Sequence, residues 1–318
     1  MFKVLLLGTS LYLCSGKSSF LMKKVKQNIK SKVVAKGSPK KITKRGRRGA
    51  KNSQSWLNKT TAILIAIAVI IFLSGTVTPK GCSTNRKVAS IDNIEIPAKI
   101  YDRAEQIIHH KGYSVSYNED LRIPNWVAYE LTPGEVLGNE ERSDNFIPDP
   151  MVIGVCPNTK DYTRSGYDRG HMAPAADMKW DEEAMEESFY MTNICPQLHT
   201  MNSGIWKSYE ERARKWATTD TIWIVCGPVV GENPKRIGAN RVAVPTYFFK
   251  SFLKRVDGGY SALAILCPNV AERKKMRDYI VPVDYIEDIT GIDLYHLLPD
   301  SLEKSIEALT PYKLWGIK

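Results

Sequence analysis

The chain has 318 residues, enough for one or two domains that bury a substantial core. Its formal net charge of +11 is unevenly distributed, because sixteen of the 45 Lys and Arg residues lie in residues 1–78, which contain no Asp or Glu. The rest of the chain therefore holds 29 basic and 34 acidic residues and is net acidic. The positive net charge of the whole chain therefore does not by itself indicate a nucleic-acid-binding fold.

The first part of the chain has the composition of a disordered segment. Residues 17–59 are rich in Lys, Arg, Ser and Gly and show little apolar periodicity. We interpret residues 1–60 as a basic cytoplasmic arm.

An uncharged apolar stretch, "TAILIAIAVIIFLSGTV", follows at Thr61–Val77. Seventeen residues are at the short end for a helix that spans a bilayer, so a buried core element is the alternative. The basic residues before it predict a cytoplasmic N-terminus and an external C-terminal part. We therefore predict a single-pass anchor of the cytoplasmic membrane at residues 61–77, with the following domain on its outer side. Secretion after signal cleavage is the alternative, because small residues follow in "LSGTV".

Residues 78–94 are interpreted as a linker and residues 95–318 as the folded domain. The first segment, residues 100–113, is predicted to be irregular or partly helical, with His109 and His110 on a surface helix. An amphipathic helix is expected over residues 201–219, because Ile205, Tyr209 and Trp216 recur near helical spacing. A second helix is expected at 301–309. Apolar runs bounded by turn residues predict the strands 113–120, 125–132, 221–230, 242–255 and 260–269.

Strands that occur in blocks, rather than alternating regularly with helices, indicate an α+β fold with a largely antiparallel central sheet. The cysteines form no C-x-x-C pair, which argues against a zinc cluster. Cys226 and Cys267 each end an apolar run, and we expect them to be buried thiols.

The stretch "YDRGHMAPAADM", Tyr167–Met178, concentrates reactive side chains in few residues. Histidine has a pKa near neutrality and serves as a general base with little tuning, so His171 is a candidate base. Asn202 either caps the predicted helix or supplies an amide oxygen to Mg²⁺, which needs few protein ligands. With Arg169 and Arg142 to bind phosphate, these residues would suit phosphodiester cleavage. A polar turn with an incidental histidine is the alternative.

The chain from about Ile94 to Lys318 resembles the DNA/RNA non-specific endonuclease family, which includes Serratia nuclease and mitochondrial endonuclease G. The resemblance rests on Asp168-Arg169-Gly170-His171, on the "TNICPQ" and "MNSGIWKSYE" segments after it, and on later segments "VCGPVV", "VPTYFFK", "LCPN" and "IEDITGIDLYHLLP". It implies a ββα-metal fold, in which a ribbon of strand and loop carries the histidine and a helix carries the metal ligand.

The resemblance also implies roles for the central residues. His171 would be the general base that takes a proton from the attacking water. Asn202 would be the one direct protein ligand of a hydrated Mg²⁺, with Mn²⁺ as a substitute. Glu210, two turns further along the helix, would hold waters of that ion.

Several other residues are assigned supporting roles by the same resemblance. Arg169 and Arg142 would act in catalysis and in binding substrate phosphate, and Arg214 would bind substrate. Asn193 would orient His171 or its loop, and Asp168 would brace the turn.

The resulting prediction is a Mg²⁺-dependent endonuclease that cuts DNA and RNA to 5′-phosphate and 3′-hydroxyl ends. The alternative is a catalytically inactive relative that only binds nucleic acid at the envelope. A zinc hydrolase of another substrate lacks support, because no HExxH or equivalent ligand set is present. The sequence leaves the oligomeric state undecided between a monomer and a homodimer, because some members of the family are dimers.

Overall fold

The computed structural model describes residues 91–318. The predicted basic arm, the predicted membrane anchor at 61–77 and most of the predicted linker lie outside the described residues. Within residues 91–318, no helix is long and apolar enough to cross a bilayer. The arm, the anchor and the localisation that they imply therefore stay predictions.

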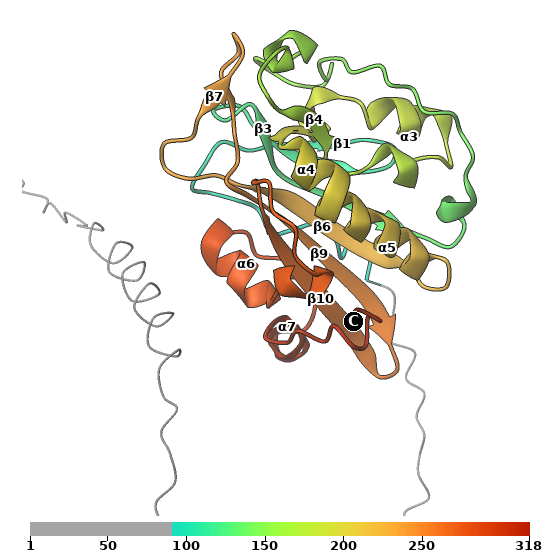
Figure 1. Cartoon of the computed structure of the whole chain (residues 1–318). Helices are drawn as coiled ribbons and strands as arrows, with labels where there is room; N and C mark the ends of the chain where they lie inside the picture. Colours follow the sequence, from blue (N-terminus) through green and yellow to red (C-terminus); the bar gives the residue numbers. More distant parts are fainter. Residues whose placement is uncertain (1–90) are drawn as a thin grey trace, which may run out of the picture. The chain divides into compact units, whose positions relative to one another are not determined.

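A seven-stranded sheet in which all neighbouring strands are antiparallel organises the domain (Figure 1). Its order is β1-β2-β3-β6-β9-β10-β11, with bounds Gln106–His109, Ser114–Asn118, Ile123–Leu131, Ile222–Val229, Tyr247–Val256, Gly259–Pro268 and Ile280–Val281. Two small antiparallel ribbons complete the strands: β4 (Asp168–His171) with β5 (Ile194–Gln197), and β7 (Arg236–Ile237) with β8 (Val242–Ala243). The predicted mixed fold with a large antiparallel sheet is confirmed.

Short helices pack around this sheet. The α-helices are α3 (Glu182–Glu187), α4 (His199–Met201), α5 (Lys207–Ala217), α6 (Val283–Thr290) and α7 (Asp300–Glu307). A π-helical segment, Asn202–Trp206, joins α4 to α5, and the chain kinks in it at Gly204. Single 3₁₀ turns lie at Glu135–Leu137, Thr159–Tyr162, Ala175–Asp177, Met191–Asn193 and Met276–Tyr279. The helices predicted over 201–219 and 301–309 are thus present, the first with a kink.

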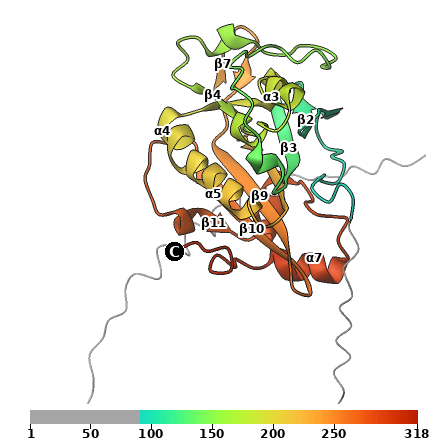
Figure 2. The ribbon, with the colours of Figure 1, turned by 90° about the vertical axis from the view of Figure 1, so that its right-hand side faces the viewer.

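The central strands are apolar on both faces because both faces of the sheet are covered. On β9, Phe248 and Phe252 belong to the core that includes Trp206 and Tyr209 from the α4–α5 segment. Their neighbours Phe249 and Leu253 point the other way, into a second core shared with α6 and α7. This follows from the two-residue period of a strand. Figures 1 and 2 show α5 and α7 on opposite sides of the sheet.

The prediction for residues 100–113 was wrong, because residues 106–109 form the edge strand β1. Ile108 is 2 % exposed while Ile107 is 40 % exposed, the alternation of a strand with one buried face. Nor does His110 lie on a surface helix. Its side chain is fully buried, with Nε2 2.9 Å from Asp149 and Nδ1 3.4 Å from Glu187. Four residues are too few to reveal a strand period in the sequence.

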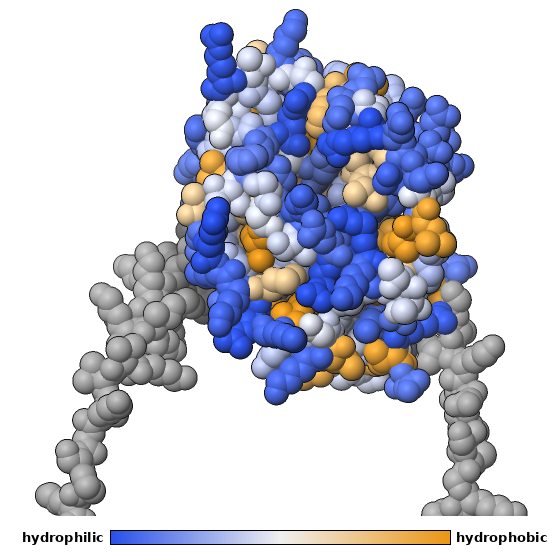
Figure 3. Space-filling view, turned by 45° about the vertical axis from the view of Figure 1, so that its right-hand side comes forward, coloured by the Kyte–Doolittle hydropathy of each residue, from blue (hydrophilic) through white to orange (hydrophobic). Residues whose placement is uncertain are grey.

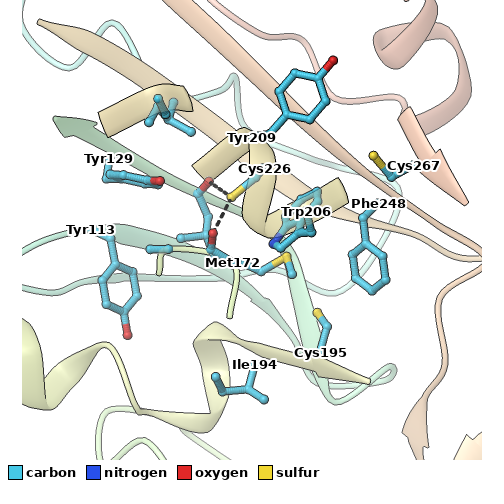
Figure 4. Packing of buried hydrophobic residues seen from close by; sticks show 14 of the residues in the cluster. Tyr113, Tyr129, Met172, Ile194, Cys195, Trp206, Tyr209, Cys226, Phe248 and Cys267 are labelled. Carbon is cyan, nitrogen blue, oxygen red and sulfur yellow. Dashed lines mark hydrogen bonds between the residues drawn. The ribbon is translucent and has the colours of Figure 1, made fainter. Parts of the chain in front are cut away.

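The expectation of buried thiols at Cys226 and Cys267 is confirmed, since both are fully buried and free. The Cys226 thiol donates to the carbonyl oxygens of Met172, at 3.2 Å, and Val127, at 3.6 Å (Figure 4). Met172 follows His171 directly, so this core also holds the backbone at the end of β4. On the face seen in Figure 3, hydrophilic side chains predominate and apolar ones form small separate groups.

Candidate active site

His171 is the last residue of β4 and pairs with Ile194 of β5. Its ring is 9 % exposed and packs between Phe146, at 5.3 Å between centroids, and Phe189, at 5.0 Å. The ring nitrogen Nε2 is buried and has no hydrogen-bond partner among the described residues. The aromatic packing on both sides fixes the plane of the imidazole.

The glycine of the D-R-G-H motif has a steric role. Gly170 lies opposite Cys195 in the β4–β5 ribbon, and a Cβ atom at this position would overlap the side chain of the buried Gln197. Glycine therefore lets the two strands approach closely beside His171.

The backbone after His171 is held by interior side chains. Asn193 is fully buried; its Oδ1 accepts from the Ala173 amide at 2.9 Å, and its Nδ2 donates to the carbonyl oxygens of Ala173 and Ser188, each at 2.8 Å. The indole of Trp206 donates to the His171 carbonyl at 3.2 Å. An amide enclosed in this way positions the chain and has no path to a substrate.

A buried lysine that the sequence analysis missed belongs to the same support. Lys250, on β9, is fully buried; its Nζ donates to the Met172 carbonyl at 3.1 Å and lies 4.5 Å from the centre of the Trp206 ring. The signal in the sequence was a single charge in the apolar strand "YFFKSFL", at an even position that faces the same core as Phe248 and Phe252.

Asn202 is not the N-cap of its helix, because the helical segment begins three residues earlier, at His199. Its Nδ2 donates to Asp168 Oδ2 at 2.9 Å, and the same carboxylate oxygen lies 2.9 Å from His199 Nδ1. Because the NH₂ side of the amide faces Asp168, the carbonyl oxygen Oδ1 is the atom that a cation would meet. A hard amide oxygen with a carboxylate beside it fits Mg²⁺, which takes few protein ligands and keeps its waters.

An open pocket lies beside these groups, and Asn202 and Asp168 belong to its lining together with Arg142, Arg169 and Phe146. The Arg169 guanidinium stacks over Phe146 at 4.2 Å from the ring centre, and that of Arg142 over Phe189 at 4.8 Å. Both rings also contact His171. Arg142 is in addition paired with Asp144. The structure thus brings two guanidinium groups and the Asn202 amide around one pocket, and the His171 imidazole packs against Phe146 of its lining.

Glu210 and Arg214 lie further along α5, in a buried charged cluster rather than in the lining of this pocket. Arg214 Nη1 donates to Asp177 Oδ1 at 2.7 Å, and the hydroxyl of Tyr129 donates to Asp177 Oδ2 at 2.9 Å. Burial raises the pKa of Glu210 to about 7, with Lys250 and Arg214 acting in the opposite direction. Arg214 therefore has a structural partner in the protein interior.

Burial, followed by the positive charges of Arg142 and Arg169, lowers the pKa of His171 to about 3, against an opposing effect of Asp144. The imidazole is therefore neutral over the whole physiological range and carries a free lone pair, while the low pKa makes it a weaker base than an ordinary histidine.

This shift predicts a loss of stability in acid. Between pH 6.5 and pH 3 the unfolded chain binds a proton at His171 that the folded chain does not, so stability falls as pH falls. The free energy of unfolding of the wild type should drop relative to His171→Gln by about 1.4 kcal/mol for each pH unit below 6.5. Urea unfolding of both proteins at pH 7 and pH 4.5 measures this. A difference that is the same at both pH values would contradict a neutral buried imidazole.

Comparisons with known proteins identify the family of the chain. The family described as DNA/RNA non-specific endonuclease matches residues 92–301. The chain is 33 % identical over 207 residues to the mitochondrial nuclease EXOG of Danio rerio, covering 59 % of this chain and 60 % of that protein. It is 32 % identical over 241 residues to the mitochondrial nuclease of Saccharomyces cerevisiae, covering 66 % and 70 %. The chain thus spans less than two thirds of the length of the EXOG relative.

A solved structure has a similar fold. The chain in the crystal structure of the EndoG/EndoGI complex superimposes with a TM-score of 0.59 and 27 % identity, covering 64 % of this chain and 90 % of that one. With the family match over residues 92–301 and the site geometry above, the chain belongs to the DNA/RNA non-specific endonuclease family.

Proposed function

We propose that this chain is a Mg²⁺-dependent endonuclease that hydrolyses phosphodiester bonds of both DNA and RNA, leaving 5′-phosphate and 3′-hydroxyl ends. The observation that carries the proposal is the pocket in which Arg142, Arg169 and Asn202 surround a space next to His171. Family membership supports the same reaction class.

The proposed chemistry assigns one task to each group. His171 accepts a proton from the water whose oxygen bonds to phosphorus, the bond from phosphorus to the 3′ oxygen breaks, and the leaving 3′ oxygen takes a proton from solvent water. The guanidinium groups of Arg169 and Arg142 bind non-bridging phosphate oxygens, for which their planar donors are suited. Asp168 holds the Asn202 amide with its oxygen toward the pocket. A Mg²⁺ ion at this oxygen would offset negative charge on the phosphate in the transition state.

The same groups explain why the enzyme would accept both nucleic acids. The cationic and metal-binding side chains of the pocket are suited to phosphate, which DNA and RNA share. The net acidic composition of the region after residue 78 does not oppose this, because phosphate binding needs only a local cluster of positive charge.

Asn202→Ala should reduce cleavage at limiting Mg²⁺ by about 100-fold, with partial recovery at higher Mg²⁺, because the variant lacks the amide oxygen for the ion. The measurement uses the full chain, purified in detergent, on supercoiled plasmid DNA and on RNA, with Mg²⁺ or with EDTA. The wild type should cleave both substrates with Mg²⁺ and neither with EDTA. Asn233→Ala, at an exposed asparagine in the loop after β6, is the matched control and should behave as wild type.

Two results would decide against the proposal. Binding of DNA in a gel-shift experiment without cleavage in Mg²⁺ or Mn²⁺ would favour an inactive nucleic-acid-binding relative. Full cleavage by Asn202→Ala at limiting Mg²⁺ would remove this residue as the metal ligand.

A further inference from the structure

A cluster of carboxylates lies on the side of the sheet opposite the candidate active site, where α6 and α7 cover the second core. On α6, Asp284 and Glu287 are three residues apart, and on α7, Glu303 and Glu307 are four residues apart, so each pair shares one face of its helix. Carboxylate oxygens of Asp284, Glu287 and Glu307 all lie within 4.8 Å of one another. Two helices thus bring together like charges that ordinarily repel.

Glu307 shows that this cluster is more than a charged surface. Its side chain is 4 % exposed, and its oxygen Oε1 is buried with no hydrogen-bond partner among residues 91–318. The Oε1 of Glu303 is also buried and has no hydrogen-bond partner among residues 91–318. A buried carboxylate oxygen without a donor is costly, so these atoms call for a partner that supplies positive charge.

The charges that act on Glu307 are all negative: Glu287, Glu303, Asp284 and Asp293. Burial and these neighbours disfavour a negative charge at this position. Glu287 already accepts one hydrogen bond, from the Leu294 amide to Oε1 at 2.7 Å.

We propose that Asp284, Glu287 and Glu307 form a Ca²⁺ site that ties α6 to α7. Ca²⁺ takes carboxylate and carbonyl oxygens at about 2.3–2.6 Å, so oxygens that lie within 4.8 Å of one another are close enough to share one ion. Mg²⁺ is usually bound through one or two carboxylates and keeps several waters, so three protein carboxylates suit Ca²⁺ better. The site is separate from Asn202 and does not depend on the proposed nuclease reaction.

The site would stabilise the end of the chain. After α7, the chain runs to Trp315, whose carbonyl accepts from the indole of Trp216 on α5 at 2.9 Å, with ring centroids 4.7 Å apart. A cation that fixes α7 on α6 therefore also restrains the segment that packs against the helix of the candidate active site. Its effect is expected in stability rather than in the chemical step.

The test measures the melting temperature of the full chain in detergent, first in EDTA and then with millimolar Ca²⁺ as the probe. All proteins carry Asn202→Ala, so that Ca²⁺ at the catalytic position does not contribute. Ca²⁺ should raise the melting temperature of this parent by about 5 °C. Adding Glu307→Gln should abolish the shift, and the neutral amide should leave the protein folded in EDTA. Adding Asp288→Asn, which removes an exposed charge next to Glu287, should keep it.

Equilibrium dialysis gives a second measurement, with one Ca²⁺ bound per chain expected in the parent and none after Glu307→Gln. If Glu307→Gln does not fold, Asp284→Asn replaces it, because Asp284 is exposed and its substitution leaves the core intact. No Ca²⁺-dependent shift in the parent, or an equal shift in the ligand variants, would overturn the proposal. Loss of nuclease activity alone has no bearing on it.

Discussion

Replacing His171 with alanine is expected to lower kcat/KM for DNA and RNA cleavage by about 10³-fold or more, within the range of general-base contributions. The reason is that the neutral imidazole, enclosed by Phe146 and Phe189, is the group beside the pocket that is suited to accept the proton of the attacking water. Single-turnover cleavage of a labelled duplex in Mg²⁺ measures the loss. Substrate binding should change little, because the two guanidinium groups remain.

His296→Ala is the matched control, since it removes an exposed histidine in the segment between α6 and α7. It should retain wild-type cleavage. Thermal unfolding of both variants separates a chemical effect from a structural one. Cleavage by a folded His171→Ala protein within tenfold of the wild type would refute the role of His171 as base.

Arg214→Met is expected to lower the free energy of unfolding by about 3 kcal/mol. Asp177 is 1 % exposed, and Arg214 supplies the positive charge bound to it, at 2.7 Å. The variant leaves a carboxylate in the interior with only the hydroxyl of Tyr129, at 2.9 Å, and burial already raises the pKa of Asp177. Urea unfolding at pH 7 measures the change.

A double-mutant cycle identifies the cause of this loss. Adding Asp177→Asn to Arg214→Met should recover part of the stability, because the neutral amide still accepts from Tyr129 and carries no charge. Arg212→Met, on the same helix, should stay within about 0.5 kcal/mol of wild type. If Arg214→Met instead unfolds like the wild type and only raises KM, then Arg214 serves substrate binding, as the sequence analysis expected.

The functional motif could be predicted from the sequence, but its geometry could not. Residue chemistry and the family resemblance name His171, Arg169 and Asn202 as candidates, and the structure places Arg169 and Asn202 in one pocket lining, with His171 against Phe146 of that lining. The kink at Gly204 and the early start of the helix at His199 could not be foreseen, and they decide that Asn202 is a candidate ligand and not a cap. Sequence reasoning assigned Arg214 to the substrate, since it could not show that Asp177 would lie next to it.

By itself, the sequence of this protein determined the features that depend on local pattern: the β2–β3 pair, the strands β6, β9 and β10, the amphipathic α5 helix and the identity of the motif residues. Short-range periodicity and residue chemistry are sufficient for these. Tertiary structure alone decided which distant residues meet. It enclosed His171 between Phe146 and Phe189, and it brought the buried Lys250 ammonium to the backbone carbonyl of Met172, to which it donates a hydrogen bond. It also brought the acidic faces of α6 and α7 together. Contacts of this kind could not be predicted from the sequence, because packing across a core depends on the whole chain and leaves no periodic pattern in the sequence.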